Sequence, residues 1–294
     1  MGALSGSRTQ DRTLLAICSE ATSCSAGRTG SQASVYLLWS RSKKRQNLMP
    51  KREPTRCVHC GQPMAQETRD HVFPKSWYPE TTPGEVQRWT APSCGTCNNK
   101  LGGMEKEVFN RLALCVDPRK TEVAGLSAKA MRSLGIGAED LSPEEAEHRR
   151  AQKLKIVGAT RPYKAGTETL PGLGPHPGFP EDQLLQIDIP ADQLREVAKK
   201  MVRGCEFVLA NRIIEKPYDV GIYFVHEHNV PDILVRAFEG PSANTTHLGP
   251  GFSVTRAAAH DEPDAVMYKI IVWGTLVIYA AILPESDLGD ARIT

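Results

Sequence analysis

The chain has 294 residues, of which 40% are hydrophobic and 24% are charged, and its formal net charge is +2. These values are typical of a soluble globular protein with one large domain or two smaller ones. A net charge so close to zero argues against a polyanionic partner recognised by overall charge, so a nucleic-acid site has to come from a local cluster of basic residues.

Residues 1–48 are rich in Ser, Thr, Gly and Arg and lack sustained hydrophobic periodicity. We therefore predict a disordered N-terminal tail, with a basic arm or an organelle-targeting peptide as alternatives and Met49 as an alternative start. The longest apolar run, 270–283, is shorter than the ~20 residues of a membrane span and is predicted to be buried core. We expect neither a secretory signal nor a membrane anchor.

Two Cys-x-x-Cys pairs lie in the next segment, 49–118. They are Cys57 with Cys60 and Cys94 with Cys97. Two such pairs are typical of a tetrahedral zinc site with four thiolate ligands, whereas the alternatives are two unrelated pairs or a redox pair. Reduced thiolates imply a cytoplasmic location.

The residues around the cysteine pairs are consistent with metal-binding turns. Gly61 follows the second cysteine and Gly95 lies inside the second pair, where glycine tolerates the backbone angles that point amides at sulfur. The interval 61–93 is longer than the roughly 15–20 residues between the pairs of ordinary zinc ribbons, so an additional segment is inserted between the two pairs. That insert contains Asp70 and His71. His59 could replace a cysteine as a ligand, but it is expected to be a surface histidine.

The order of these parts resembles the HNH endonucleases, which are ββα-metal nucleases. The resemblance covers roughly 57–115 and depends on "DHVFP" followed by "CGTCNNK", with these matching residues: Cys57, Cys60, Asp70, His71, Cys94, Cys97 and Asn98. It implies a strand that ends near 70–71, a second strand at about 86–92 and a helix that begins around 96–98. Structural zinc would hold this hairpin to the helix.

The resemblance also implies a reaction, the hydrolysis of phosphodiester bonds in DNA, with RNA left open as a substrate. A neutral imidazole can take the proton of the attacking water, so His71 is assigned as the general base. A carboxylate and an amide oxygen suit Mg²⁺ or Mn²⁺, so Asp70 and Asn98 are assigned as ligands of a catalytic divalent ion. The segment 75–88 lacks the asparagine that braces the base in many relatives, and Thr81, Thr82 or a backbone contact is the expected substitute.

Other residues near the motif have two interpretations each. Glu105 lies two helical turns after Asn98 and either reaches the site or is solvated. Three basic residues either contact phosphates or are ordinary surface charges: Lys75, Arg88 and Lys100. Trp77 and Trp89 either stack on bases or, as we expect, pack in the core.

The rest of the chain completes an α+β protein. Segment 119–157 is predicted to be helical, with Ser142, Pro143 and Glu145 as a helix start, and 158–181 is a Pro/Gly-rich linker. Segment 182–285 is a small α+β domain that selects substrate, forms a homodimer or binds another partner, and 286–294 is a tail. The main alternative function is a non-catalytic, zinc-stabilised nucleic-acid-binding module, and a third is a protein-interaction zinc finger.

Overall fold

The computed structural model of the chain describes residues 56–136, 141–175, 180–226, 229–259, 262 and 264–288. The predicted disordered tail 1–48 lies outside these residues, as does most of the predicted tail 286–294. The described part is α+β, as predicted, and its largest sheet has five antiparallel strands. None of the described helices is both long enough and apolar enough to cross a membrane.

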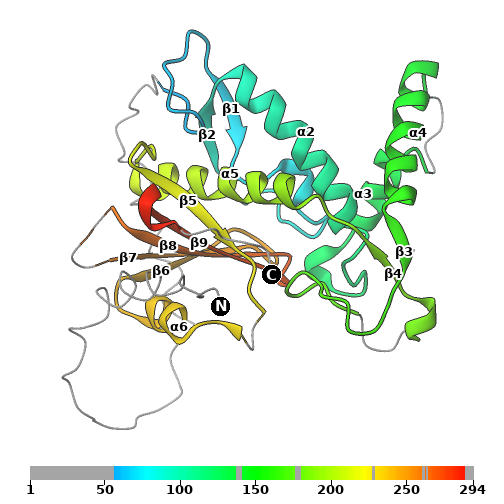
Figure 1. Ribbon diagram of the computed structural model, residues 1–294. Coiled ribbons are helices and arrows are strands. Elements are labelled where there is room, and N and C mark those ends of the chain that lie inside the picture. The colour runs from blue at the N-terminus through cyan, green and yellow to red at the C-terminus, as the bar shows by residue number, and fades with distance from the viewer. Residues whose placement is uncertain are drawn as a thin grey trace, which may run out of the picture.

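A short hairpin and a long helix form the first unit (Figure 1). Strand β1 (Thr68–His71) pairs antiparallel with β2 (Thr90–Ser93), which places Asp70 opposite Ala91. Helix α2 (Gly95–Leu112) follows β2 almost at once. The strand predicted to end at 70–71, the second strand and the helix start are thus confirmed to within a few residues.

The middle of the chain contains two further helices and a small sheet. Helix α3 (Leu126–Ser133) precedes α4 (Pro143–Gly158), and β3 (Thr160–Pro162) pairs with β4 (Leu185–Ile187). The predicted helix start is confirmed, because the Ser142 hydroxyl accepts a hydrogen bond of 3.2 Å from the Glu145 amide. The interval predicted as a linker includes β3, a strand too short to show alternation in the sequence.

Helix α5 (Ala191–Ala210) leads into the five-stranded sheet. The sheet has the order β5-β9-β8-β7-β6, and α6 (Asp232–Glu239) lies between β5 and β6 in the chain. The strands are β5 (Tyr218–Tyr223), β6 (Ala243–His247), β7 (Ser253–Ala258), β8 (Val266–Val272) and β9 (Leu276–Pro284). The apolar run 270–283 is confirmed as buried core. It belongs to β8 and β9, which are joined by a tight turn in which Trp273 and Gly274 have φ of 58° and 65°.

One hydrophobic cluster joins the hairpin unit to α5 and the sheet. The Trp77 and Trp273 rings lie 5.3 Å apart, and the Phe73 and Phe252 rings lie 5.5 Å apart. The Trp273 indole N–H also donates to the Trp77 carbonyl at 2.6 Å. The core role expected for Trp77 is confirmed, and the hairpin unit gains apolar burial that its own short strands cannot supply.

Helix α5 lies between α2 and the sheet (Figure 1), and Gly204 allows it to approach the hairpin closely. A Cβ at Gly204 would lie 2.7 Å from Val72 Cγ2 and 3.0 Å from Val72 Cγ1. Val72 directly follows β1, so a larger residue at 204 would push the helix away from the strand that carries Asp70 and His71. Lys200 lies one helical turn before Gly204 and projects from a similar face of α5.

Candidate functional site

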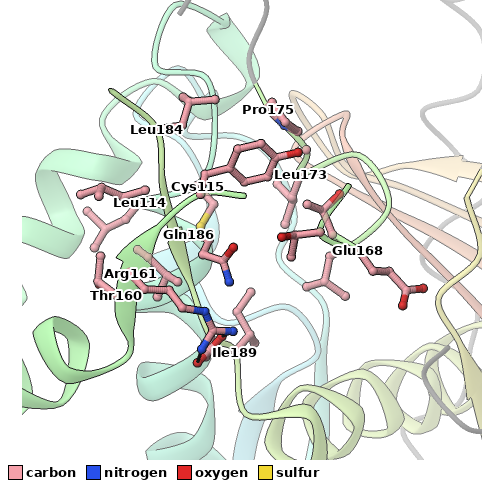
Figure 2. A pocket seen from close by; sticks show the side chains of 18 of the residues that line it. Leu114, Cys115, Thr160, Arg161, Glu168, Leu173, Pro175, Leu184, Gln186 and Ile189 are labelled. Carbon is pink, nitrogen blue, oxygen red and sulfur yellow. Dashed lines mark hydrogen bonds and ion pairs between the residues drawn. The ribbon is translucent and has the colours of Figure 1, made fainter. Parts of the chain in front are cut away.

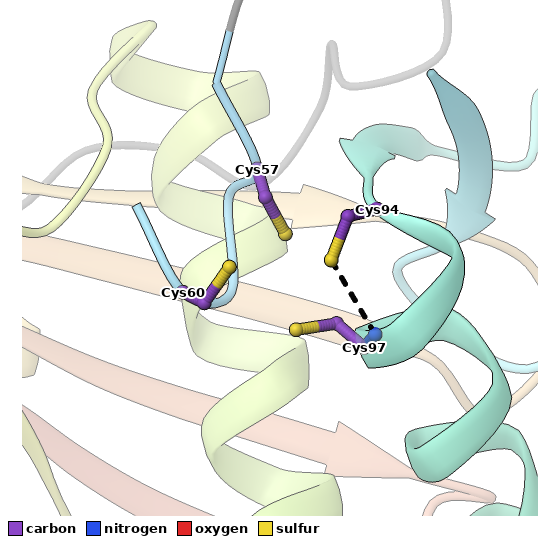
Figure 3. Close-up of side chains that lie close together, drawn as sticks. All are labelled: Cys57, Cys60, Cys94 and Cys97. Carbon is purple, nitrogen blue, oxygen red and sulfur yellow. Dashed lines mark hydrogen bonds between the residues drawn. The ribbon is translucent and has the colours of Figure 1, made fainter. Parts of the chain in front are cut away.

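The four cysteines of the two pairs gather at one point (Figure 3). Their sulfur atoms all lie within 4.8 Å of one another, although Cys57 and Cys60 precede β1 and Cys94 and Cys97 follow β2. Four Zn–S bonds of about 2.3 Å in a tetrahedron give sulfur–sulfur distances of roughly 3.8 Å. The cluster could therefore hold one metal ion with little movement of the chain.

Local structure explains how the two pairs meet. The Val58 amide donates to the Pro92 carbonyl at 3.0 Å, which ties the first pair to β2. Cys94 is the N-cap of α2, and its sulfur accepts from the Cys97 amide at 3.4 Å. Gly61 has a φ of 69°, as the glycine argument predicted, whereas Gly95 begins α2 without a positive φ.

Cys57 and Cys97 of this cluster have pKa values shifted in opposite directions. Burial acts to raise the pKa of Cys57, but backbone hydrogen bonds at Cys94, Cys60 and His59 lower it further, to about 7. Burial, together with the neighbouring cysteine sulfurs, raises the pKa of Cys97. A thiolate is the form that binds a metal, so Cys57 is already prepared to act as a ligand near neutral pH.

Asp70 is a buried carboxylate with partners on both oxygens. His59 Nε2 lies 3.0 Å from Oδ2, and Lys200 Nζ lies 3.0 Å from Oδ1. Burial alone would raise the pKa of Asp70, but the hydrogen bond from His59 and the charge of Lys200 outweigh it and lower the pKa below its usual value. The expectation that His59 is a surface residue is wrong, because its side chain is only 4% exposed and packs against Asp70.

His71 occupies the last position of β1, where side chains alternate, so that its imidazole and the Asp70 carboxylate leave opposite faces of the strand. The ring is half-buried, and burial lowers its pKa more than the Asp70 charge raises it. The imidazole is therefore neutral near pH 7, which is the state a general base requires. Its Nδ1 is buried and has no hydrogen-bond partner among the described residues.

The threonines expected to brace His71 do not do so. The Thr81 hydroxyl donates to the Thr121 carbonyl at 2.9 Å, and the buried Thr82 hydroxyl has no partner in the described part of the chain. Among the described residues, neither a threonine nor a backbone group braces the buried Nδ1 of His71.

Asn98 lies in the first turns of α2, and its side-chain nitrogen donates to the Thr68 hydroxyl at 3.2 Å. Thr68 is two residues before Asp70 and shares its face of β1. The hairpin and α2 thus bring Asn98 to the same side of the strand as Asp70. No hydrogen bond or ion pair among the described residues joins Asn98 directly to Asp70 or His71.

Comparison with protein-family models, with curated proteins and with solved structures finds no match for this chain. The roles of the residues around Asp70 therefore have to be argued from their own chemistry and positions.

Two residues complete the surroundings of Asp70. Glu105 of α2 binds Lys200, and its side chain is 14% exposed, so the solvated alternative for Glu105 is wrong. Lys200 of α5 is 1% exposed and also donates to the His71 carbonyl at 2.6 Å. Lys200 was not among the predicted site residues, and its position beside the apolar residues Val197 and Met201 of α5 is the only signal of its burial in the sequence.

The basic and aromatic residues flanking the motif have different surroundings. Lys75 and Lys100 are exposed, while Arg88 is half-buried with its guanidinium 5.3 Å from the centre of the Tyr78 ring. Trp89 is partly buried against the core, which confirms a packing role. Lys75 and Lys100 are thus the flanking cations most available to a polyanion.

A separate cavity of about 720 Å³ lies beside the β3–β4 hairpin (Figure 2). Its lining is mixed, with Leu114, Leu173 and Ile189 beside Glu168 and Arg161. Arg161 is already paired with Asp188 at 2.7 Å. None of the predicted site residues lines this cavity, so it is distinct from the Asp70–His71 strand.

Proposed function

We propose that this chain is a metal-dependent endonuclease of the HNH type that hydrolyses phosphodiester bonds in DNA. The observation that supports it most is the unit formed by β1, β2 and α2, in which four clustered sulfurs fix the hairpin to the helix. This unit carries Asp70 and His71 at the end of one strand and Asn98 in the first turns of the adjoining helix.

Structural zinc is the ion that suits the four cysteines. Thiolates prefer zinc among the common divalent ions, and a closed set of four is typical of structural sites. Its role is to hold the two ends of the inserted segment 61–93 together. Catalysis is assigned to residues of that insert and of α2, away from the sulfurs.

His71 is the general base in this proposal. Its neutral imidazole takes a proton from the water that attacks phosphorus, and its half-buried position leaves part of the ring accessible to substrate. Asp70 and Asn98 would hold the catalytic divalent ion through oxygen atoms, the donors that Mg²⁺ and Mn²⁺ prefer. When bound, such an ion neutralises charge on the phosphate and the leaving oxygen.

The surroundings of Asp70 fit a cation. The Lys200 ammonium is a cation at this place, in contact with oxygens of Asp70, His71 and Glu105. The same observation favours a second candidate, a non-catalytic nucleic-acid-binding module, because a permanent ammonium leaves less need for a divalent ion. In that case Lys75 and Lys100 would contact phosphates without any cleavage.

One experiment separates the two candidates. Zinc-loaded protein is incubated with supercoiled plasmid and Mg²⁺ or Mn²⁺, and binding to the same DNA is followed in parallel in EDTA at a concentration that leaves the zinc in place. Ion-dependent nicking with 5′-phosphate ends supports the endonuclease. Binding without nicking at any ion concentration supports the non-catalytic module, and neither binding nor nicking contradicts both.

A further inference from the structure

Lys200 is a lysine whose side chain is only 1% exposed. Lysine is almost never buried to this extent unless its ammonium is paired. Its Nζ contacts Asp70 Oδ1 at 3.0 Å, the His71 carbonyl at 2.6 Å and the Glu105 carboxylate. An ammonium has three N–H donors and no acceptor, so these contacts use all of its protons.

The three oxygens around Lys200 come from two elements of the fold, and the ammonium comes from a third. Asp70 and His71 belong to β1, Glu105 belongs to α2, and Lys200 itself arrives on α5. The close contact of Gly204 with Val72 sets the distance between α5 and β1. The ammonium is therefore held among these oxygens by the packing of a long helix rather than by a flexible loop.

These oxygens are also ligands of the kind that hard divalent cations prefer, since two are carboxylates and one is a backbone carbonyl. Without the ammonium, the carboxyl groups of Asp70 and Glu105 would share a largely buried place with no cation between them. Buried charge without compensation is costly, so removing Lys200 would leave a strong demand for another cation.

We infer that Lys200 is the resident cation of an oxygen cage formed by Asp70, Glu105 and the His71 carbonyl, and that its ammonium competes there with a divalent ion. The inference rests on the proposed function only for Asp70, which would be shared with the ion assigned there to Asp70 and Asn98; Glu105 and the His71 carbonyl are added as ligands. Competition makes ion binding weak in the free protein.

The test measures binding of Mn²⁺ to zinc-loaded protein by electron paramagnetic resonance, without nucleic acid. Lys200→Met should bind one Mn²⁺ per chain about 10-fold to 100-fold more tightly than the natural chain, the range seen when groups next to metal ligands are altered. Lys199→Met is the matched control, because Lys199 lies on the same helix but pairs with Glu196 and Asp219. It should bind Mn²⁺ like the natural chain. Adding Asp70→Asn to Lys200→Met should abolish the gain.

Equal Mn²⁺ affinity in a folded Lys200→Met variant, or a gain that survives Asp70→Asn, would overturn the inference. Circular dichroism and zinc content establish that the variant is folded. If it is not, Glu105→Gln in the natural background is the second variant. It should weaken Mn²⁺ binding relative to Glu85→Gln, which changes an exposed residue, and equal affinity of the two contradicts the inference.

Cleavage is measured separately, so the two proposals can fail independently. If Lys200→Met binds Mn²⁺ tightly but no variant nicks DNA, the endonuclease proposal is wrong and the proposed competition between Lys200 and the ion still holds. If the natural chain nicks DNA but Lys200→Met has an unchanged Mn²⁺ affinity, the proposed competition is wrong and the endonuclease proposal still holds.

Discussion

Substitution of Gly204 by alanine tests whether α5 is held against the hairpin as closely as the structure indicates. Alanine is favoured over glycine inside a helix by about 1 kcal/mol, so the change alone would stabilise the protein. The added Cβ would lie 2.7 Å from Val72 Cγ2, and overpacking of this kind typically costs about 1–3 kcal/mol. We therefore expect the net free energy of unfolding to fall by up to about 2 kcal/mol.

Gly102→Ala is the control for this prediction. Gly102 also lies inside a long helix, α2, but a Cβ there meets nothing within 4 Å. Both variants share the helix-propensity gain, so their difference of about 1–3 kcal/mol isolates the steric effect. Urea denaturation of zinc-loaded protein measures it, with equal slopes required for the comparison. Equal stabilisation by the two alanines would refute the close contact between α5 and Val72.

Two further substitutions test the metal cluster and a buried ion-pair network. Cys94→Ser should lose the zinc ion and unfold the hairpin unit, because binding of structural zinc is largely folding free energy; retention of one zinc per chain, measured by mass spectrometry, would contradict the four-sulfur site. Glu206→Gln should reduce the free energy of unfolding at pH 7 by about 3–5 kcal/mol, because the buried carboxylate of Glu206 binds Arg256 at 2.9 Å and also the Tyr268 hydroxyl. Burial raises the pKa of Glu206, but these partners lower it below the ordinary 4.5. The carboxylate therefore stabilises the fold above pH 4.5, and this contribution is lost as the pH falls through the lower folded value. Denaturation between pH 7 and pH 3 should show a smaller acid-induced loss in the glutamine variant, and an unchanged loss would contradict the assignment.

The parts of the fold that local signals specify could be predicted. The Cys-x-x-Cys spacing and the Ser142–Pro143 helix start each act over a few residues, and both elements have the expected form. The clustering of two cysteine pairs across the insert 61–93 was also predicted, because one metal ion needs both pairs.

The surroundings of Asp70 could not be predicted in the same way. Lys200 is remote from Asp70 in the sequence, and its burial depends on three oxygen partners that only the packed fold brings together. His59 was expected at the surface because it is polar and lies between two cysteines. Its contact with Asp70 depends on how the first cysteine pair folds back over β1, which neither hydrophobicity nor spacing reveals.

Plasmid nicking by His71→Ala is the most direct test of the proposed endonuclease. The variant is compared with the natural chain and with His148→Ala, which alters an exposed histidine of α4, and all three proteins are first shown to hold zinc and to have equal stability. A general base typically contributes about 10²-fold to 10⁴-fold to the rate, so we expect a loss of this size for His71→Ala and none for His148→Ala. Ion-dependent nicking by His71→Ala at the natural rate would contradict the assignment of His71 and the endonuclease mechanism built on it.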